Sequence, residues 1–270
     1  MIRPLAFASI ILSVSTLALA GPYAPAAGQP GSDAIAGSSP LFTEWASGYT
    51  DFQPGPMNIA NPAAGVASAG SPSAALGAAD GTGIVSLGDG GSISLTFDTP
   101  IVDGAGADFA VFENGFGDNF LELAFVDVST NGVDFFRFPS VSLTQNSTQL
   151  GGFGSLDATN LYDLAGKYRA NFGTPFDLSE LAGVSPLLNV NDVRYVRITD
   201  VIGTINPLYA SLDSLGNIVN DPYSTPFASG GFDLDAVGVL HMSAVPEPTS
   251  LISLGLGLTI LVTLRRRRTR

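Results

Sequence analysis

The sequence predicts an all-β protein: a single β-sandwich of jelly-roll type with long N-terminal loops, plus a C-terminal transmembrane helix. Short apolar–polar alternations recur from residue 84 onward, separated by turns rich in Gly, Pro and Asn, as in sandwiches and jelly rolls. Helical patterns are confined to residues 161–168 and 178–181. The 270-residue chain has no cysteine, but a body of this size buries a sufficient core without disulfides.

Two turns join expected hairpins. Residues 88–91, with three glycines, separate two apolar stretches at 84–87 and 92–97. Residues 130–132 connect two further stretches in the same way. The remaining strands are expected at residues 108–113, 121–129, 133–138, 193–199 and 232–240.

Alternation also predicts which side chains share a face. On the strand at 193–199, one face is expected to carry Val193, Tyr195 and Arg197, and the other Arg194, Val196 and Ile198. On the last strand, Asp233 and Asp235 are expected on one face, and Phe232, Leu234 and Ala236 on the other.

Residues 21–83 are rich in Gly, Ala, Pro and Ser. We expect loops that wrap the body and insert Trp45 and Phe52 into it, with a disordered arm as the alternative. The organisation along the chain is then a signal peptide, an N-terminal wrap, a sandwich core, a linker, a membrane anchor and a basic tail, at residues 1–20, 21–83, 84–241, 242–248, 249–264 and 265–270.

The N-terminus has the three parts of a secretory signal. Arg3 begins it, an apolar core follows, and Ala18 and Ala20 form a small-x-small cleavage site for signal peptidase. An uncleaved membrane helix or an ordinary buried helix is the alternative, although the apolar stretch is short for a span.

The C-terminus has the pattern of a stop-transfer segment. An apolar stretch at residues 249–264 ends at four consecutive arginines, and a helix of that length reaches about 24 Å, slightly under a hydrocarbon core of roughly 30 Å. Basic flanks stay cytoplasmic, so the body is expected outside the cytoplasm. The four arginines are Arg265, Arg266, Arg267 and Arg268.

Pro246, Glu247 and Pro248 precede this span. A Pro-Glu-Pro triplet, a short span and an arginine cluster together resemble the PEP-CTERM sorting signal of Gram-negative bacteria. The resemblance implies an exported protein of the cell surface or outer envelope, anchored in the membrane until an exosortase cleaves near the triplet. The two prolines keep this site extended. A plain, unprocessed anchor is the alternative.

The exported body is strongly acidic. Residues 21–244 hold 23 acidic residues against five basic ones, a formal charge of −18. Such a surface repels nucleic acid and attracts divalent cations. Without cysteine, and with His241 as the only histidine, thiol nucleophiles and multi-histidine metal sites are excluded.

Two sequence segments of the body resemble parts of secreted jelly-roll domains. Residues 121–136 are similar to a hairpin of galactose-binding-like and discoidin-like domains, and residues 231–239 to the last strand of carbohydrate-associated sandwiches. Together with residues 75–81 they resemble an uncharacterised cell-surface domain that often carries this sorting tail, from which no activity carries over.

Calcium is the cofactor that these residues favour, because Ca²⁺ takes carboxylate, amide and carbonyl oxygens. In galactose-binding-like domains a structural Ca²⁺ joins an early loop to the final strand, which would here join Asp80 to that strand. Turn formation and pairing with arginine are the alternative roles. The candidate ligands are Asp80, Glu113, Asn114, Asp200, Asp233 and Asp235.

Function is less constrained. Carbohydrate binding needs aromatic platforms beside polar groups, and the candidate platforms are Trp45, Tyr49, Tyr162, Tyr168, Tyr209 and Tyr223. We expect a non-catalytic module associated with exopolysaccharide, stabilised by calcium. The alternatives are a polysaccharide hydrolase using Glu113 and Glu122, since two carboxylates suffice for that chemistry, and a ligand-free coat protein.

Overall fold

A computed structural model of the chain describes residues 20–244. The apolar core of the expected signal peptide lies outside the described residues. So do Ala18, the Pro-Glu-Pro triplet, the expected membrane helix and the arginine cluster, and the described residues test none of the roles expected for them.

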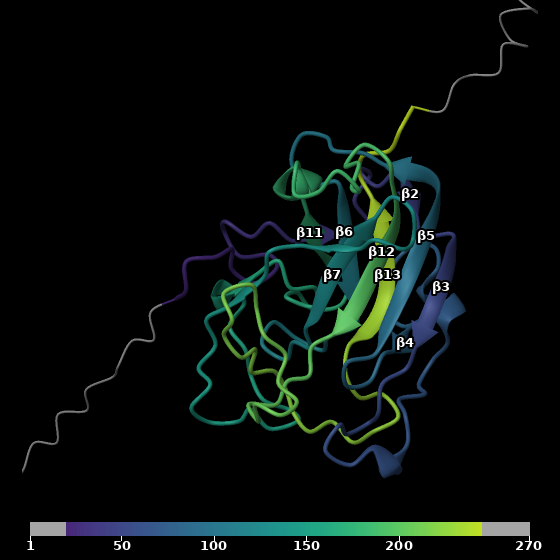
Figure 1. The fold of residues 1–270 in the computed structure, drawn as a ribbon. Helices are drawn as coiled ribbons and strands as arrows, with labels where there is room; N and C mark the ends of the chain where they lie inside the picture. Colours follow the sequence, from purple (N-terminus) through teal and green to yellow (C-terminus); the bar gives the residue numbers. More distant parts are fainter. Residues whose placement is uncertain (1–19, 245–270) are drawn as a thin grey trace, which may run out of the picture.

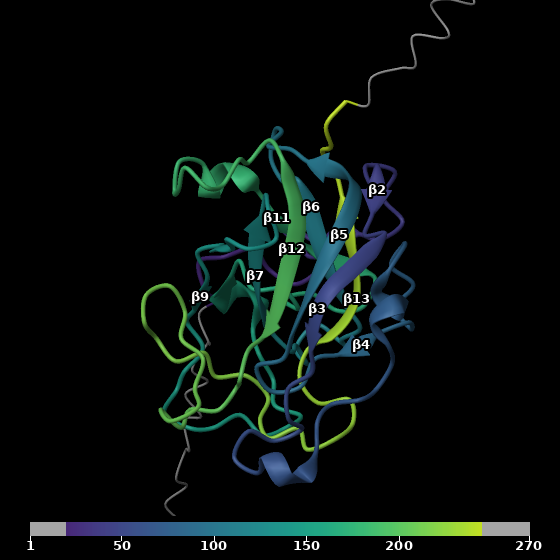
Figure 2. The same ribbon diagram turned by 45° about the vertical axis from the view of Figure 1, so that its right-hand side comes forward.

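Two antiparallel sheets pack face to face (Figures 1 and 2), which confirms the all-β sandwich. The first sheet has the order β1 (Ile35–Ala36), β11 (Phe172–Phe176), β6 (Phe109–Glu113), β13 (Asp233–Val239) and β2 (Glu44–Trp45), and β4 (Val85–Ser86) also pairs with β13. The second has the order β3 (Gly48–Gln53), β5 (Ser92–Ile101), β12 (Val193–Asp200), β7 (Ala124–Ser129) and β8 (Phe136–Arg137).

The other elements are short. They are the strand pair β9 (Val141–Ser142) and β10 (Leu161–Tyr162), and the 3₁₀ helices η1 (Pro62–Ala64), η2 (Pro72–Ala75), η3 (Ala158–Asn160) and η4 (Leu178–Leu181).

The main core lies between the sheets and draws on β6 and β13 of one and β5, β7 and β12 of the other. At its centre the ring of Phe109 stacks on Phe176 with 5.4 Å between centroids. Phe138 meets both rings edge-on, at 5.8 and 5.1 Å. Aromatic contacts of this kind add to the free energy gained by burying the rings.

The expected hairpin around residues 88–91 is wrong. β4 pairs with β13 in the first sheet, whereas β5 pairs with β3 and β12 in the second. Gly88 and Gly90 adopt positive φ, and a Cβ on Gly91 would lie 1.9 Å from the carbonyl oxygen of Leu87. The glycines therefore serve a tight crossing between sheets, which local pattern does not distinguish from a hairpin turn.

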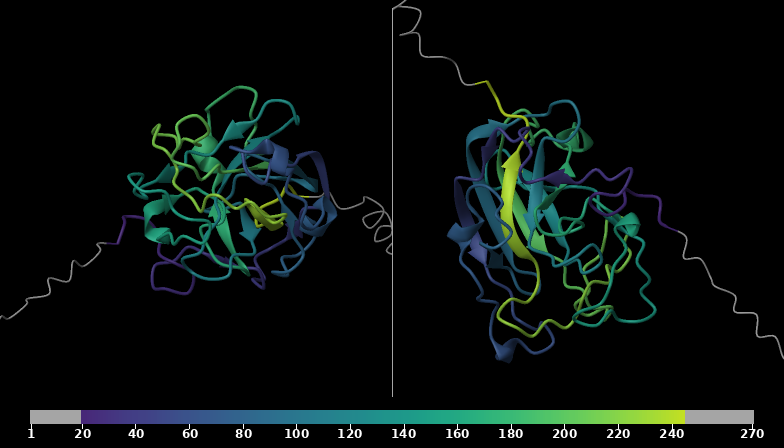
Figure 3. Two further views of the ribbon diagram at one scale, coloured as in Figure 1. Left: turned by 90° about the horizontal axis from the view of Figure 1, so that it is seen from below. Right: turned by 180° about the vertical axis from the view of Figure 1, so that it is seen from behind.

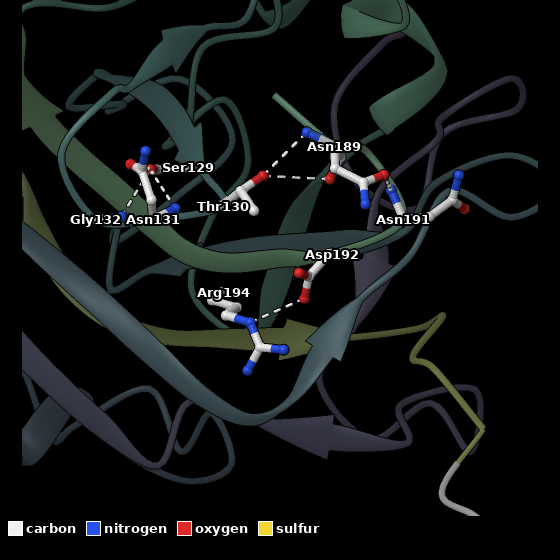
Figure 4. Close-up of polar contacts among 8 residues, drawn as sticks. All are labelled: Ser129, Thr130, Asn131, Gly132, Asn189, Asn191, Asp192 and Arg194. Carbon is white, nitrogen blue, oxygen red and sulfur yellow. Dashed lines mark hydrogen bonds and ion pairs between the residues drawn. The ribbon is translucent and has the colours of Figure 1, made fainter. Parts of the chain in front are cut away.

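The second hairpin is confirmed, because β7 and β8 pair antiparallel. The Ser129 hydroxyl accepts hydrogen bonds from the amides of Asn131 and Gly132, at 3.2 and 2.9 Å (Figure 4). Thr130 Oγ1 accepts from the Asn189 amide at 3.0 Å, which joins this turn to the segment that enters β12. A salt bridge of 2.8 Å between Arg194 and the neighbouring Asp192 lies beside it.

Register shifts on β12 and β13 change which side chains share a face, so two of the expected faces are wrong. Between β12 and β5 the register shifts at Val193 to Tyr195, so that Val193 enters the core with Val196 and Ile198 instead of lying with Tyr195.

On β13, Leu234 faces Glu113 and Ala236 faces Phe112, which leaves Asp235 as the extra residue of a β-bulge. Leu234 therefore joins the main core while Ala236 joins a separate cluster, not the common face that strict alternation predicts.

The expected helix at residues 161–168 is also wrong, since the segment begins with β10. Asp163 has φ 45° and Gly166 has φ 80°, neither compatible with a right-handed helix. A Cβ on Gly166 would lie 1.8 Å from the Glu122 carbonyl oxygen. The short helix expected at residues 178–181 is present as η4.

Residues 21–83 are built into both sheets. They supply β1 and β2 to the first sheet and β3 to the second. Trp45 packs against Phe42 and Phe112, at 4.7 and 5.5 Å between ring centroids, and Phe52 packs against the main core.

Long connections gather at one end of the sandwich, and the last described residues leave from the other (Figures 1 and 3). β13 joins these ends, because its first residue, Asp233, lies at the loop end and Ala244 lies beyond its last.

Truncation of the stacked core should be costly. Phe109→Ala is expected to lower the free energy of unfolding by about 3–5 kcal/mol, because it leaves a cavity among rings that pack closely. Urea denaturation of the purified chain in mild detergent measures this. Val133→Ala, at a residue 81% exposed, is the control and should change it by less than about 0.5 kcal/mol; equal effects would contradict the assigned core.

Candidate binding site

A pocket opens at the loop end of the sandwich, and four phenylalanines line it. Phe116 and Phe120 come from the connection between β6 and β7, Phe153 from the connection between β9 and β10, and Phe227 from the segment that precedes β13. Residues far apart in the sequence thus meet at one opening.

The four rings form a continuous row. Centroids lie 5.6 Å apart between Phe116 and Phe120, 5.9 Å between Phe120 and Phe153, and 6.1 Å between Phe153 and Phe227. Phe116, Phe153 and Phe227 are 83%, 76% and 48% exposed. A contiguous exposed apolar patch with polar neighbours is typical of binding surfaces, so the row is the leading candidate among the described residues.

Two carboxylates line the same pocket, whose volume is about 350 Å³ including its open mouth. Asp233 accepts a hydrogen bond from the Ser86 hydroxyl. Glu122 is 8% exposed, and none of the described hydrogen bonds reaches its carboxylate. Thr225 and Ser229 add hydroxyl groups to the wall. The pocket therefore combines apolar rings with acidic and hydroxyl groups.

Two further carboxylates are buried close to this pair. Glu113 Oε2 accepts from the Gly115 amide at 2.7 Å, and Asp221 Oδ2 from the Leu123 amide at 3.0 Å. The second oxygen of each, Glu113 Oε1 and Asp221 Oδ1, is buried without a hydrogen-bond partner in the described part of the chain. Buried polar atoms are rarely left so.

The environment of these acids favours the protonated form. Burial raises the pKa of Glu113, Glu122 and Asp221 well above the usual range, and that of Asp233 to about 6. Repulsion from the neighbouring carboxylates is the next cause of the Glu122 shift, with Glu113 the strongest contributor and Asp233 second. The four groups therefore interact as one cluster.

No basic side chain of the described residues neutralises this cluster. Arg137, Arg169 and Arg194 form salt bridges with Asp127, Asp118 and Asp192. Arg197 lies over the ring of Phe135, and Lys167 over that of Tyr168. These are the five basic residues of the body, and all are engaged elsewhere.

The structure distributes the predicted calcium ligands over three places. Glu113 and Asp233 belong to the pocket cluster, and the Asn114 backbone amide lies against the Glu113 carboxylate. Asp235 accepts from the amides of Asp80 and Gly81, at 3.3 and 3.0 Å.

Asp80 in turn accepts from the amides of Thr82 and Gly83, both at 2.7 Å. The bonds to Asp80 hold the loop in its turn. The early loop and the last strand are thus joined directly by hydrogen bonds between Asp235 and the loop amides.

Asp200 is fully buried, and its oxygens accept from the amides of Gly90 and Phe232 at 2.9 and 2.7 Å. It holds the crossing turn against the segment that enters β13. Burial raises its pKa well above the usual range, and repulsion from Asp89 and Asp221 adds to this.

The aromatic residues expected to form platforms are not brought together at this pocket. Trp45 belongs to the cluster with Phe42, Tyr168 is buried, and the Tyr223 hydroxyl donates to Asn58. The four pocket phenylalanines were missed because isolated Phe residues are ordinarily counted as core.

The pair weighed for hydrolysis, Glu113 and Glu122, belongs to one cluster, since the charge of Glu113 contributes to the raised pKa of Glu122. Glu113 is only 1% exposed, however, and so offers no surface to a substrate.

A second acidic group lies at the opposite end. Asp103, Asp108 and Asp177 bring carboxylate oxygens within 4.8 Å of one another. The buried Asp108 accepts from the amides of Gly104 and Leu178, both at 2.7 Å, and its Oδ1 lies 2.8 Å from His241 Nδ1. Both its oxygens are thus occupied, and it ties η4 to the end of β13.

Comparison with known proteins identifies one segment. Residues 244–268 match the PEP-CTERM protein-sorting motif. The chain carries a PEP-CTERM motif. No curated protein matches the chain. The motif implies that the protein is exported, associates with the cell envelope and is processed by an exosortase-type system.

The match begins at Ala244, just beyond the end of β13. Figure 3 shows the last described residues at one end of the sandwich and the long connections at the other. Because those connections supply the pocket phenylalanines, the matched segment starts at the end opposite the pocket. Among residues 20–244, no helix has the length and apolar character needed to cross a bilayer.

A third acidic group surrounds Asp163, which has positive φ. Burial raises the pKa of Asp163 to about 8, and Glu180 on η4 adds to this through its charge and a shared hydrogen bond. Asp33 raises the pKa further, while Lys167 opposes these effects. The folded protein therefore holds a proton here that the unfolded chain releases above about pH 4.

Because the folded-state pKa of Asp163 is the higher one, stability falls as pH rises from about 4 to about 8. Asp163→Asn should flatten this fall, which urea denaturation at pH 5, 7 and 9 measures. Asp51→Asn is the matched control, since Asp51 also has positive φ but is exposed. The same pH dependence in Asp163→Asn and the parent chain would contradict this assignment.

Proposed function

We propose that the exported body is a non-catalytic binding module of the cell envelope that takes polysaccharide at its phenylalanine pocket. The row of exposed rings carries the proposal. Pyranose rings present apolar C–H faces that suit aromatic side chains, and their hydroxyl groups suit the carboxylates and hydroxyls beside them. Such mixed lining is what ligand pockets use for affinity and orientation.

The position of the pocket supports this function. Ala244, where the match to the PEP-CTERM motif begins, and the pocket lie at opposite ends of β13, so a body held through its C-terminal segment presents the rings away from the attachment point. Such a module would link the envelope to the surrounding exopolysaccharide.

The charge of the body selects among polysaccharides. With a formal charge of −18 over residues 21–244, the protein repels uronic-acid polymers at low ionic strength. Neutral glycans are therefore the class that this pocket fits.

Removal of exposed rings tests the pocket. The double variant Phe116→Ala, Phe153→Ala should lose retention on an immobilised neutral exopolysaccharide at least tenfold, measured with the full chain in mild detergent. Truncating one hot-spot aromatic typically costs more than about 1 kcal/mol of binding. The stability of this variant should not change, because both rings are exposed.

Val184→Ala, Leu187→Ala is the matched control, since both residues are more than half exposed and lie between η4 and β12. Equal retention of all three proteins, or no retention of the parent chain, would favour the coat-protein alternative. Release of reducing sugar that Glu122→Gln abolishes would favour the hydrolase.

The processing step is tested at the triplet. Replacement of Pro246, Glu247 and Pro248 by alanine should leave the C-terminal segment attached, so that the chain stays in the membrane fraction at higher mass. Immunoblotting of fractionated cells compares it with the parent chain. If both chains show the same mass and distribution, the triplet does not direct cleavage.

A further inference from the structure

We infer that a divalent cation of calcium's size binds beneath the phenylalanine pocket, held by Glu113, Glu122 and Asp233 with Asp221 close by. The ion would share Glu122 and Asp233 with the glycan pocket proposed above, so calcium binding and glycan retention are measured separately. It differs from the calcium ligands expected from the sequence, because it includes Glu122 and Asp221 and leaves out Asp80, Asn114, Asp200 and Asp235.

Orphaned oxygens provide the first reason. Glu113 and Asp221 are 1% and 4% exposed, and one carboxylate oxygen of each has no hydrogen-bond partner among the described residues. The other oxygen of each accepts a backbone hydrogen bond, from Gly115 and Leu123 respectively, which fixes the carboxylate. Leaving a buried acceptor unsatisfied costs about 1–3 kcal/mol, and a cation removes that cost for both.

Unbalanced charge is the second reason to place a cation here. These carboxylates lie at one end of the sandwich: Glu122 and Asp233 line one pocket, Asp221 binds the amide of Leu123 beside Glu122, and Glu113 lies opposite Leu234, the neighbour of Asp233. All five basic residues of the body are engaged elsewhere. Buried carboxylates without a basic partner are neutralised either by protons or by a metal ion, and hard oxygen ligands of this kind favour calcium.

Access from solvent is the third reason to place a cation here. Glu122 and Asp233 line an open pocket, with Thr225 and Ser229 on its wall. A cation reaches them from solvent without opening the core, and water completes its shell of six to eight oxygens. Glu122 accepts no hydrogen bond among the described residues, so none has to break when its carboxylate binds the ion.

The rival group is Asp103, Asp108 and Asp177, the one described trio whose oxygens already lie within 4.8 Å of one another. Asp108 is occupied there by two amides and His241, and Asp177 Oδ1 accepts from the Ser179 amide at 2.9 Å. Ligands already committed to fixed donors bind a cation less readily. The pocket carboxylates do not form such a trio within 4.8 Å, so they must move closer together as the ion binds.

Calcium titration of the full chain in mild detergent tests the site. Isothermal calorimetry with CaCl₂ should show one ion per chain, and saturating calcium should raise Tm by about 5 °C over the EDTA-treated protein. Glu122→Gln and Asp233→Asn should each remove both effects. Glu122→Gln keeps side-chain shape and breaks no described hydrogen bond, so it should fold even if Asp233→Asn does not.

Asp103→Asn is the matched control and should keep both calcium effects. Three outcomes would overturn the site: no heat and no Tm change in the parent chain, full calcium binding in Glu122→Gln, or loss of binding only in Asp103→Asn. Failure of glycan retention with calcium binding intact would refute the glycan proposal alone.

Discussion

The pairing of β13 with β6 is the constraint on which the sandwich and its pocket depend. β13 is buried along its whole length and hydrogen-bonds to β6, β2 and β4. Its register sets Leu234 opposite Glu113, which brings the carboxylates of Glu113 and Asp233 to the same end of the sheet. A slip of one residue would exchange core and outer faces, and the acidic cluster and the core would be lost together.

The acidic composition is tolerated because the fold gives most buried carboxylates a structural partner. Asp108, Asp200 and Asp235 each accept two backbone hydrogen bonds, and in this way join segments far apart in the chain. Glu113 and Asp221 depart from this pattern, since each has one satisfied and one unsatisfied oxygen. At the pocket end, unsatisfied oxygens therefore distinguish Glu113 and Asp221 from Asp200 and Asp235, whose backbone hydrogen bonds hold the fold.

Local pattern was sufficient where a turn was stabilised by its own residues. The hairpin at residues 130–132 forms as expected because Ser129 binds the turn amides within three residues. The local pattern gave the wrong prediction at residues 88–91, where a glycine-rich turn connects the two sheets instead of forming a hairpin. It also failed on β13, because the bulge at Asp235 depends on the partner strand and not on the order of apolar and polar residues.

The sequence by itself determined the all-β class and the sorting of the protein, since strand alternation and the PEP-CTERM motif are contiguous patterns in the chain. It also pointed to Glu113 and Asp233 among the many acids. Only the tertiary structure decided that Glu122 and Asp221 join them and that four phenylalanines surround the opening. Burial, unsatisfied oxygens and the engagement of the basic side chains elsewhere depend on how segments about 100 residues apart pack, and no local window contains that information.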